Sequence, residues 1–375
     1  MNFDKLAKLD ANPDYSLGEQ LQTIHQLLAE KLPRLARIAV AIYHDGADTV
    51  HTLAHSSGAD NPLPHYAASL ATVPSLRAIK ESGQPRVLND LPAALVPDQS
   101  RPAHHSQRLL EEGYRSSYTI PIYHHENFVG FIFFNARETG FFNEETLPIL
   151  GFAAKVIATS VVQEVDATRI LTGAIVALGE VTRIRDPETG AHLQRMARFA
   201  NLIASRIADM RGLSDEFAES VFRYAPLHDV GKLATPDAVL LKPARLIDAE
   251  WDIMREHPVK GMQIVEMILR NAATPLPHVT VLTHIIRHHH EAWDGSGYPD
   301  GLVGEAIPLE ARIVTVADVF DALTTRRPYK EPWSNEDALA WMQDRANRLF
   351  DPACIAVMTE EMASFAAIQK QFPDN

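Results

Sequence analysis

The sequence predicts an α+β domain followed by a long connecting helix and an all-α bundle. Short apolar runs of strand length, separated by turn residues, fill the first third of the chain. From Glu144 onward, apolar residues instead recur at steps of three and four, which is the period of a helix. The length of 375 residues suits two domains that each bury a core. We expect the domains at 1–143 and 173–375, with the connecting helix at 144–172.

The α+β part is expected to begin with a helix over Ser16–Leu32, where Ser16 and Glu19 fit a capping box. Pro33 follows the end of this helix. Four apolar segments then read as strands: Arg37–His44, Val87–Asn89, Ser117–Tyr123 and Phe128–Asn135. The last two are separated by the polar tetrapeptide His124–Asn127, which predicts a hairpin.

The connecting helix is expected to run from Glu144 to about Thr182. A helix this long is either a core helix or a parallel dimer seam. Core packing is the simpler reading of its C-terminal end, and its N-terminal half is the better candidate for a dimer contact. We therefore expect a homodimer.

The second half is read as a helical bundle, because long amphipathic stretches alternate with loops rich in glycine and proline. These stretches are Ala191–Met210, Ser214–Asp229, Asp248–Ile268, Val279–His290, Leu309–Leu323 and Asn335–Phe350.

The composition limits the function classes. The 35 Lys+Arg and 48 Asp+Glu give a net charge of −13, so the chain has no global basic surface for a nucleic-acid polymer. A single cysteine, Cys354, excludes an internal disulfide and any zinc or iron–sulfur site built from several cysteines. Seventeen histidines indicate that a bound metal would have imidazole and carboxylate ligands.

Targeting segments are not expected. The first residues lack the basic and apolar regions of a secretory signal. The apolar stretches Phe128–Phe134 and Gly151–Val162 look too short or too interrupted for the roughly 20 residues that span a bilayer. We expect a cytoplasmic protein without a membrane partner.

The sharpest chemical signal is His228-Asp229 in the run HDVGK. The carboxylate can bridge two cations, whereas the imidazole binds one. Gly231 is expected to allow a turn that brings Lys232 back toward the same place. A lone His-Asp pair is weak evidence, since many such pairs are helix caps or surface pairs.

Further candidate ligands lie at separated positions. They are Glu188 and His192, four residues apart; His257 before a proline; the run His288–Glu291; and Asp318, with Asp321 one turn later. Each alone is better read as a cap, a buried carboxylate or a solvated helix face. Together they put ionisable groups at core positions of apolar helices, which is costly without partners. A metal cluster is the natural partner.

The runs HDVGKLATPDAVLLKPARL, EHPVKG and HHHEAWDGSGYPDGL resemble the HD-GYP subgroup of the HD-domain metal-dependent phosphohydrolases. This resemblance covers about residues 173–351, and the name-giving triplet is present as Gly297-Tyr298-Pro299. In the first third, SLRAIKESGQPRVLND and YTIPIYHHENFVGFIFFN resemble the GAF family of sensor domains.

The HD-GYP resemblance implies hydrolysis of cyclic di-GMP to pGpG, and often onward to GMP. It carries over a set of metal ligands: His192, His228, the bridging Asp229, His257, His289, His290 and Asp318. Glu188 is similar to the residue of members that hold three metals, usually iron. We therefore expect a di- or trinuclear centre, with three metals favoured and iron preferred over manganese. Two cations about 3.5–4 Å apart can activate a bridging water and clamp phosphoryl oxygens.

The same resemblance assigns the other site residues. Asp229 and Lys232 would be catalytic, with Lys232 contacting the scissile phosphate. Arg327 and Lys330 match phosphate-binding positions, and Asp321 would hydrogen-bond a guanine edge. Tyr298 and Pro299 would shape a loop at the rim, for substrate access or for a diguanylate cyclase partner.

Two alternatives stay open: an HD phosphohydrolase acting on another cyclic nucleotide or dinucleotide, and an inactive scaffold that binds cyclic di-GMP or a cyclase. Degenerate members usually lose the HD or HHE residues, which are present here. The GAF-like part lacks the NKFDE-type pattern of cyclic-nucleotide binders and has no cysteine for a bilin. Its ligand is unknown, and it could be a dimerisation platform.

Overall fold

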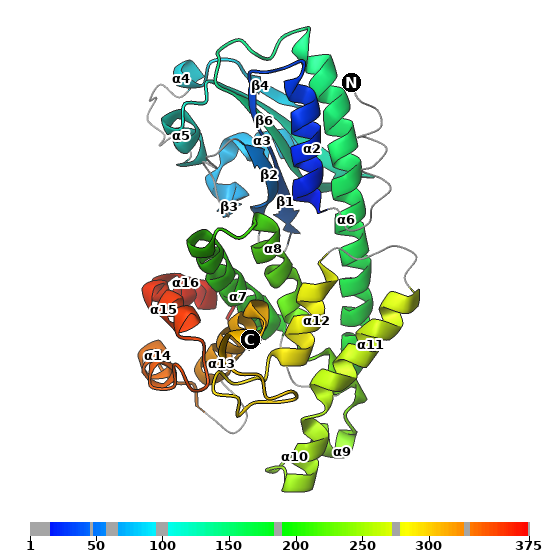
Figure 1. Cartoon of the computed structure of the whole chain (residues 1–375), viewed down its shortest axis with the longest axis vertical. Helices are drawn as coiled ribbons and strands as arrows, with labels where there is room; N and C mark the ends of the chain where they lie inside the picture. The colour runs from blue at the N-terminus through cyan, green and yellow to red at the C-terminus, as the bar shows by residue number, and fades with distance from the viewer. Residues whose placement is uncertain are drawn as a thin grey trace. The chain divides into compact units, whose positions relative to one another are not determined.

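The computed structural model describes residues 16–45, 48–57, 67–94, 104–183, 190–271, 278–325 and 331–373. The chain forms two compact units (Figure 1). The first comprises residues 1–166 with 214–216, and the second comprises residues 167–213 with 217–375.

The first unit is built on a six-stranded antiparallel sheet with the strand order β3-β2-β1-β6-β5-β4. The strands are β1 (Leu35–His44), β2 (Thr49–Ser57), β3 (Ala67–Ser69), β4 (Arg86–Leu88), β5 (Ser116–His124) and β6 (Asn127–Ala136). The predicted hairpin is confirmed, since His124 pairs with Asn127 across its turn. Strands β2 and β3 are not among the predicted strands, because the histidines and serines of β2 hide its alternating burial.

Helices cover both faces of this sheet (Figure 1). Helices α2 (Leu17–Ala29) and α6 (Thr146–Arg183) pack on one face, around Leu21, Ile38 and Phe134. The predicted capping box of Ser16 and Glu19 begins α2. Helix α3 (Pro74–Ser82) packs on the opposite face, and the short helices α4 (Leu91–Ala94) and α5 (His104–Glu111) belong to the same unit.

Helix α6 confirms the long connecting helix. Its segment Thr146–Asp166 has a mean hydropathy of 1.4 and is long and apolar enough to cross a membrane. Composition alone does not distinguish such a segment from a core helix, and here Leu150, Ile157 and Val161 are buried against the sheet. The expectation that no apolar segment reaches spanning length was therefore wrong for this helix.

The second unit is largely helical, as the periodicity predicts. Its helices are α7 (Gly190–Arg211), α8 (Asp215–Tyr224), α9 (Asp237–Leu240), α10 (Asp248–Met254), α11 (His257–Asn271), α12 (Val279–His288), α13 (Leu309–Thr324), α14 (Asn335–Gln343), α15 (Pro352–Glu360) and α16 (Met362–Gln371). Its core lies around α7 and α13, where Phe199 contacts Phe320 and Phe365 with ring centroids 5.5 and 4.7 Å apart.

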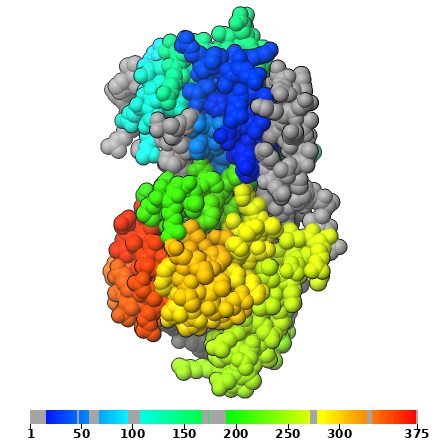
Figure 2. Space-filling model, viewed as in Figure 1, coloured from blue at the N-terminus to red at the C-terminus, as the bar shows by residue number. Residues whose placement is uncertain are grey.

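The expected helix over Asp248–Ile268 is two helices in the structure. Pro258 has no N–H to donate to the carbonyl of Met254, and its ring would clash there. Helix α10 accordingly ends at Met254, and α11 begins at His257. The predicted helix over Asn335–Phe350 also ends early, at Gln343. In the view of Figure 2, the yellow-green segment of α9 and α10 lies at the surface.

Candidate metal centre

His228 and Asp229 follow a 3-10 turn over Ala225–Leu227. The His228 side chain is fully buried, and its Nδ1 lies 2.9 Å from the carbonyl oxygen of Ala225. A carbonyl oxygen only accepts hydrogen bonds, so Nδ1 carries the proton of the neutral ring. The lone pair of His228 is therefore on Nε2, the atom that faces Asp229.

His257 and His289 are oriented by the same device. The Met254 carbonyl, which Pro258 leaves without a helical donor, accepts a hydrogen bond from His257 Nδ1 at 2.9 Å. His289 Nδ1 donates to the carbonyls of Ile285 and Ile286 at 3.0 and 3.1 Å. Both rings therefore present Nε2 as an acceptor. Burial lowers the pKa of His289, which favours this neutral form.

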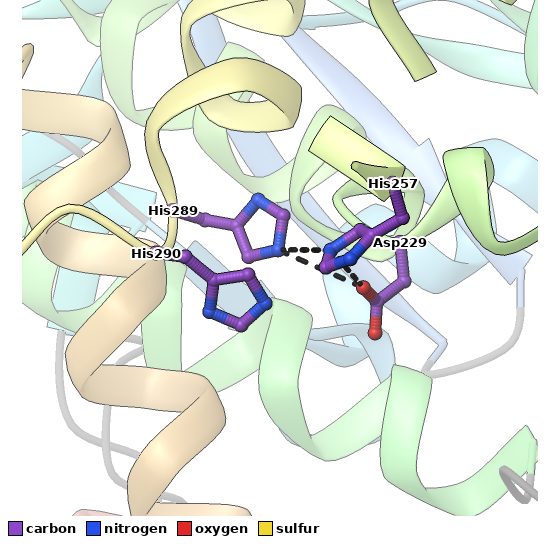
Figure 3. A group of neighbouring side chains, drawn as sticks. All are labelled: Asp229, His257, His289 and His290. Atoms are coloured by element: carbon purple, nitrogen blue, oxygen red, sulfur yellow. Dashed lines mark hydrogen bonds and ion pairs between the residues drawn. The ribbon is translucent and has the colours of Figure 1, made fainter. Parts of the chain in front are cut away.

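These lone pairs converge on one carboxylate oxygen (Figure 3). The Nε2 atoms of His257 and His289 are 3.3 Å apart, and they lie 3.0 and 3.6 Å from Oδ1 of Asp229. Three acceptors at such distances repel one another unless a cation or a proton lies between them. A metal ion with imidazole and carboxylate ligands fits this arrangement.

Asp229 joins two groups of candidate ligand atoms. The first group is Asp229, His257, His289 and His290, and the second is His192, His228 and Asp318. Within each group the ligand atoms lie within 4.8 Å of one another. Oδ1 of Asp229 faces the first group, whereas its Oδ2 lies 3.1 Å from Nε2 of His228 in the second. This geometry allows one carboxylate to bridge two cations.

Lys232 also faces Asp229. Its Nζ lies 2.6 Å from Oδ2, in the 3-10 segment Val230–Ala234. Burial alone would raise the pKa of Asp229, but the nearby positive charge of Lys232 is the largest opposing cause, and this pKa lies well below its usual range. Asp229 is therefore an anion, as a bridging ligand requires.

The expected turn is present and brings Lys232 back to Asp229, but the need for glycine at position 231 has another cause. The φ of Gly231 is not in the left-handed region. A Cβ at this position would lie 1.8 Å from the carbonyl oxygen of His257 and 2.6 Å from the nitrogen of Gly261. Glycine is needed because the HDVGK segment packs directly on the backbone of α11, and this contact brings Asp229 and His257 together.

Asp321 does not fit the expected contact with guanine. Its side chain is fully buried, and its Oδ2 accepts a hydrogen bond from His192 Nδ1 at 2.7 Å. Arg195 donates to both Asp321 oxygens, from Nε at 2.6 Å and Nη2 at 2.9 Å. Burial raises the pKa of Asp321, but these two partners outweigh it and lower the pKa. Asp321 therefore orients His192, and its oxygens have no exposed edge for a substrate.

Sequence reasoning missed Arg195. This buried guanidinium also donates to Thr325 and to the carbonyl of Phe372. A sequence signal existed, because Arg195 lies three residues after His192 and therefore on the same face of the helix. Carboxylate partners of metal-ligating histidines typically fix the ring and its tautomer.

The loop after His290 is anchored to the site. The ring of Tyr298 lies 4.8 Å from that of His290. The buried carboxylate of Glu291 accepts hydrogen bonds from the backbone of Asp300 at 2.7 Å and Leu302 at 3.0 Å. A Cβ on Gly297 would lie 2.2 Å from the nitrogen of Ala292, so the loop packs closely against the segment after the histidines.

Three expected site residues lie outside the described residues: Glu188, Arg327 and Lys330. The structure therefore does not place the third-metal residue or the two phosphate-binding cations.

The chain matches two known protein families. The HD-domain family matches residues 184–354, which include both groups of candidate ligands. The GAF-domain family matches residues 15–161. The chain combines a GAF domain with an HD domain. HD-domain phosphohydrolases depend on metal ions, which agrees with the convergence of acceptors on Asp229.

Curated relatives match the HD half. The cyclic di-GMP phosphodiesterase response regulator RpfG of Xanthomonas campestris is 46% identical over 195 residues, covering 52% of this chain and 49% of the relative. A probable cyclic di-GMP phosphodiesterase of Vibrio cholerae is 41% identical, covering 55% and 48%. The 3'3'-cGAMP-specific phosphodiesterase 2 of Vibrio cholerae is 40% identical, covering 52% and 36%. The chain thus spans about half or less of the length of these relatives.

Proposed function

We propose that this GAF–HD protein hydrolyses cyclic di-GMP to pGpG, and onward to GMP, under the control of its GAF domain. The observation that carries the proposal is the Asp229 carboxylate, whose two oxygens face two groups of buried candidate ligands. The identity of the HD half to two relatives named as cyclic di-GMP phosphodiesterases supports the substrate class.

The proposed ligands are Asp229 as the bridge, His257, His289 and His290 on one side, and His192, His228 and Asp318 on the other. Glu188 would add a third metal. Iron is the expected metal, with manganese as the alternative. When bound, these cations would supply Lewis acidity for phosphodiester hydrolysis.

The remaining roles belong to side chains of the chain itself. Lys232, held by Asp229 at 2.6 Å, has three N–H groups and could donate one to a phosphate oxygen of the substrate. Arg327 and Lys330 would bind the other phosphate. Asp321 and Arg195 act through His192 and keep its ring in place.

Further parts of the proposal concern the setting of the enzyme. We propose a cytoplasmic homodimer with a dimer contact along the N-terminal half of α6, where Phe152 is exposed. The loop that carries Tyr298 and Pro299 would be the contact for a diguanylate cyclase.

The test is turnover by the full chain, purified without oxygen and loaded with Fe(II) or Mn(II). Metal content is measured first, and hydrolysis of cyclic di-GMP is then followed by separating pGpG and GMP. We expect turnover that depends on metal and stops on chelation. A fully loaded protein that binds cyclic di-GMP without hydrolysing it would instead support the scaffold alternative.

The same assay with 3'3'-cGAMP separates the two substrate classes found among the relatives. We expect a higher kcat/KM for cyclic di-GMP, since the relative with the highest of the three reported identities is named for it. A higher kcat/KM for 3'3'-cGAMP would assign the chain to the other class.

A further inference from the structure

A buried arginine stands in the sheet of the GAF domain. Arg37 belongs to β1 and is only 2% exposed, between apolar neighbours along the strand. The neighbouring positions Ile38, Val40 and Ile42 contribute to the core under α2 and α6. Because side chains alternate along a strand, Arg37 points to the opposite face, the one covered by α3.

Arg37 has a neutral partner. Its Nη1 donates to Oδ1 of Asn135 at 3.2 Å, and the Nδ2 of Asn135 donates to Ser117 at 3.1 Å. These three residues face one another across β1, β6 and β5. All three are buried, so they form a short polar row inside the domain.

The row satisfies only part of the guanidinium. Among the described residues, Arg37 forms no ion pair within 4 Å, and its buried Nε has no hydrogen-bond acceptor. Tyr114 and Asp215 favour the cation electrostatically, but neither forms an ion pair or a hydrogen bond with it. A buried charge without a direct ionic partner is costly. Burial lowers the pKa of Arg37 only to about 10, so the group remains a cation near neutral pH.

A cavity of about 30 Å³ lies against this cation. Its polar lining residues are Arg37, Asn135 and Thr52. The other lining residues are apolar: Ala39, Val40, Ala41, Val50, Leu76, Leu109 and Phe133. A water needs roughly 10–15 Å³ by this kind of measure. The space therefore holds about two to three water-sized groups, which suits a small ligand with an anionic part at Arg37 and an apolar part against the apolar lining.

We propose that this cavity binds a short-chain carboxylate, of the size of acetate or propionate, with its carboxylate on Arg37. The planar guanidinium can donate through Nε and a second nitrogen to the two oxygens of a carboxylate. The methyl or ethyl group lies among the aliphatic and aromatic walls. Neither the HD domain nor its proposed reaction enters this inference.

The size of the ligand sets the expected affinity. The best small ligands gain about 1.5 kcal/mol per heavy atom, so a four-atom anion binds no tighter than about 10–100 μM. We therefore expect dissociation constants of about 0.1–10 mM. Benzoate should not bind, because its ring exceeds the cavity.

Binding is measured on the full chain by titration calorimetry and by the shift of the melting temperature, with total salt held constant. Acetate and propionate are expected to bind saturably. Acetamide, a neutral molecule of the same shape, is the matched control and should not bind. Equal effects of acetate, chloride and nitrate would overturn the carboxylate assignment, and the absence of any saturable effect would leave a water-filled cavity.

Variants locate the site. Arg37→Gln should weaken acetate binding at least about tenfold, because it removes a charged hydrogen-bond donor. Arg34→Gln makes the same change of charge at an exposed position of the same unit and should bind acetate like the wild type. Unchanged binding by Arg37→Gln would refute the site.

A measurement on the wild type keeps the test independent of how the variant folds. Acetate should shift the ¹³C-methyl NMR signals of Val50, Leu76 and Leu109, which line the cavity. The methyl signals of Leu21 and Ile24, in the core on the other face of the sheet, should stay in place. Shifts of the second group without the first would contradict the proposal.

Discussion

The two domains bury polar groups in opposite ways. In the HD domain, imidazole nitrogens and carboxylate oxygens converge as acceptors, with Nε2 of His257 and His289 3.3 Å apart. In the GAF domain, one buried cation, Arg37, has a neutral amide as its partner. Bound cations would stabilise the first arrangement, and a bound anion would stabilise the second. The charge that a buried set of polar groups lacks thus indicates whether the set binds a cation or an anion.

The largest expected effect is that of Asp229→Ala. This change removes the carboxylate that faces both groups of candidate ligands, so metal retention and turnover should fall by more than about 100-fold, since even outer partners of a metal site are worth 10–100-fold. Metal analysis and cyclic di-GMP hydrolysis measure the result. Asp252→Ala, at an exposed position of α10, is the control. Full metal content in Asp229→Ala would show that the two groups hold metals without this carboxylate, and would contradict its bridging role.

Glu188→Ala tests the number of metals. If Glu188 holds a third ion, the variant should lose one metal and keep two, because the two groups around Asp229 are intact. The measurement is the metal-to-protein ratio after anaerobic purification. A ratio equal to that of the wild type would refute the trinuclear centre.

Asp321→Asn separates a positioning role from a substrate contact. The amide accepts more weakly from His192 and Arg195, so metal affinity should fall by about 10–100-fold. Metal titration gives this affinity, and KM for cyclic di-GMP is measured at saturating metal. A raised KM with unchanged metal affinity would restore the guanine contact.

Gly231→Ala tests the backbone contact that brings the ligands together. The new methyl group would meet the His257 carbonyl, and such overpacking costs about 1–3 kcal/mol of unfolding free energy. Urea denaturation measures the loss. Gly151→Ala is the control, since nothing lies within 4 Å of its Cβ and a helix favours alanine. Equal stability of Gly231→Ala and the wild type would show that the segment moves freely.

The smallest expected effect is that of Arg37→Met without added carboxylate. An unbalanced buried charge contributes little to stability, so the apolar side chain should change the unfolding free energy by no more than about 1 kcal/mol, or raise it. Denaturation with and without acetate measures this. A loss above about 3 kcal/mol without acetate would mean that Arg37 is already balanced within the fold.

Much of this protein could be predicted from local sequence. The capping box of Ser16, the hairpin turn after His124 and the length of α6 are local features, and the structure confirms them. The candidate ligands His228, Asp229 and His257 were identified because ionisable residues at apolar helix positions need partners. Strand β2 is not predicted because its histidines and serines hide the alternation of burial. The helix over Asp248–Ile268 is predicted as one but is divided at Pro258, since proline cannot continue the hydrogen bonds of α10.

The sequence by itself determined the types of ligand, since a chain with one cysteine and many histidines can offer a metal cluster little but imidazole and carboxylate. Only the tertiary structure decided which oxygen of Asp229 faces which histidines, that Asp321 supports His192, and that Gly231 is a packing contact. It also decided that Arg37 borders a cavity. The physical reason is that these features join residues far apart in the chain, and their distances follow from the packing of whole helices and strands.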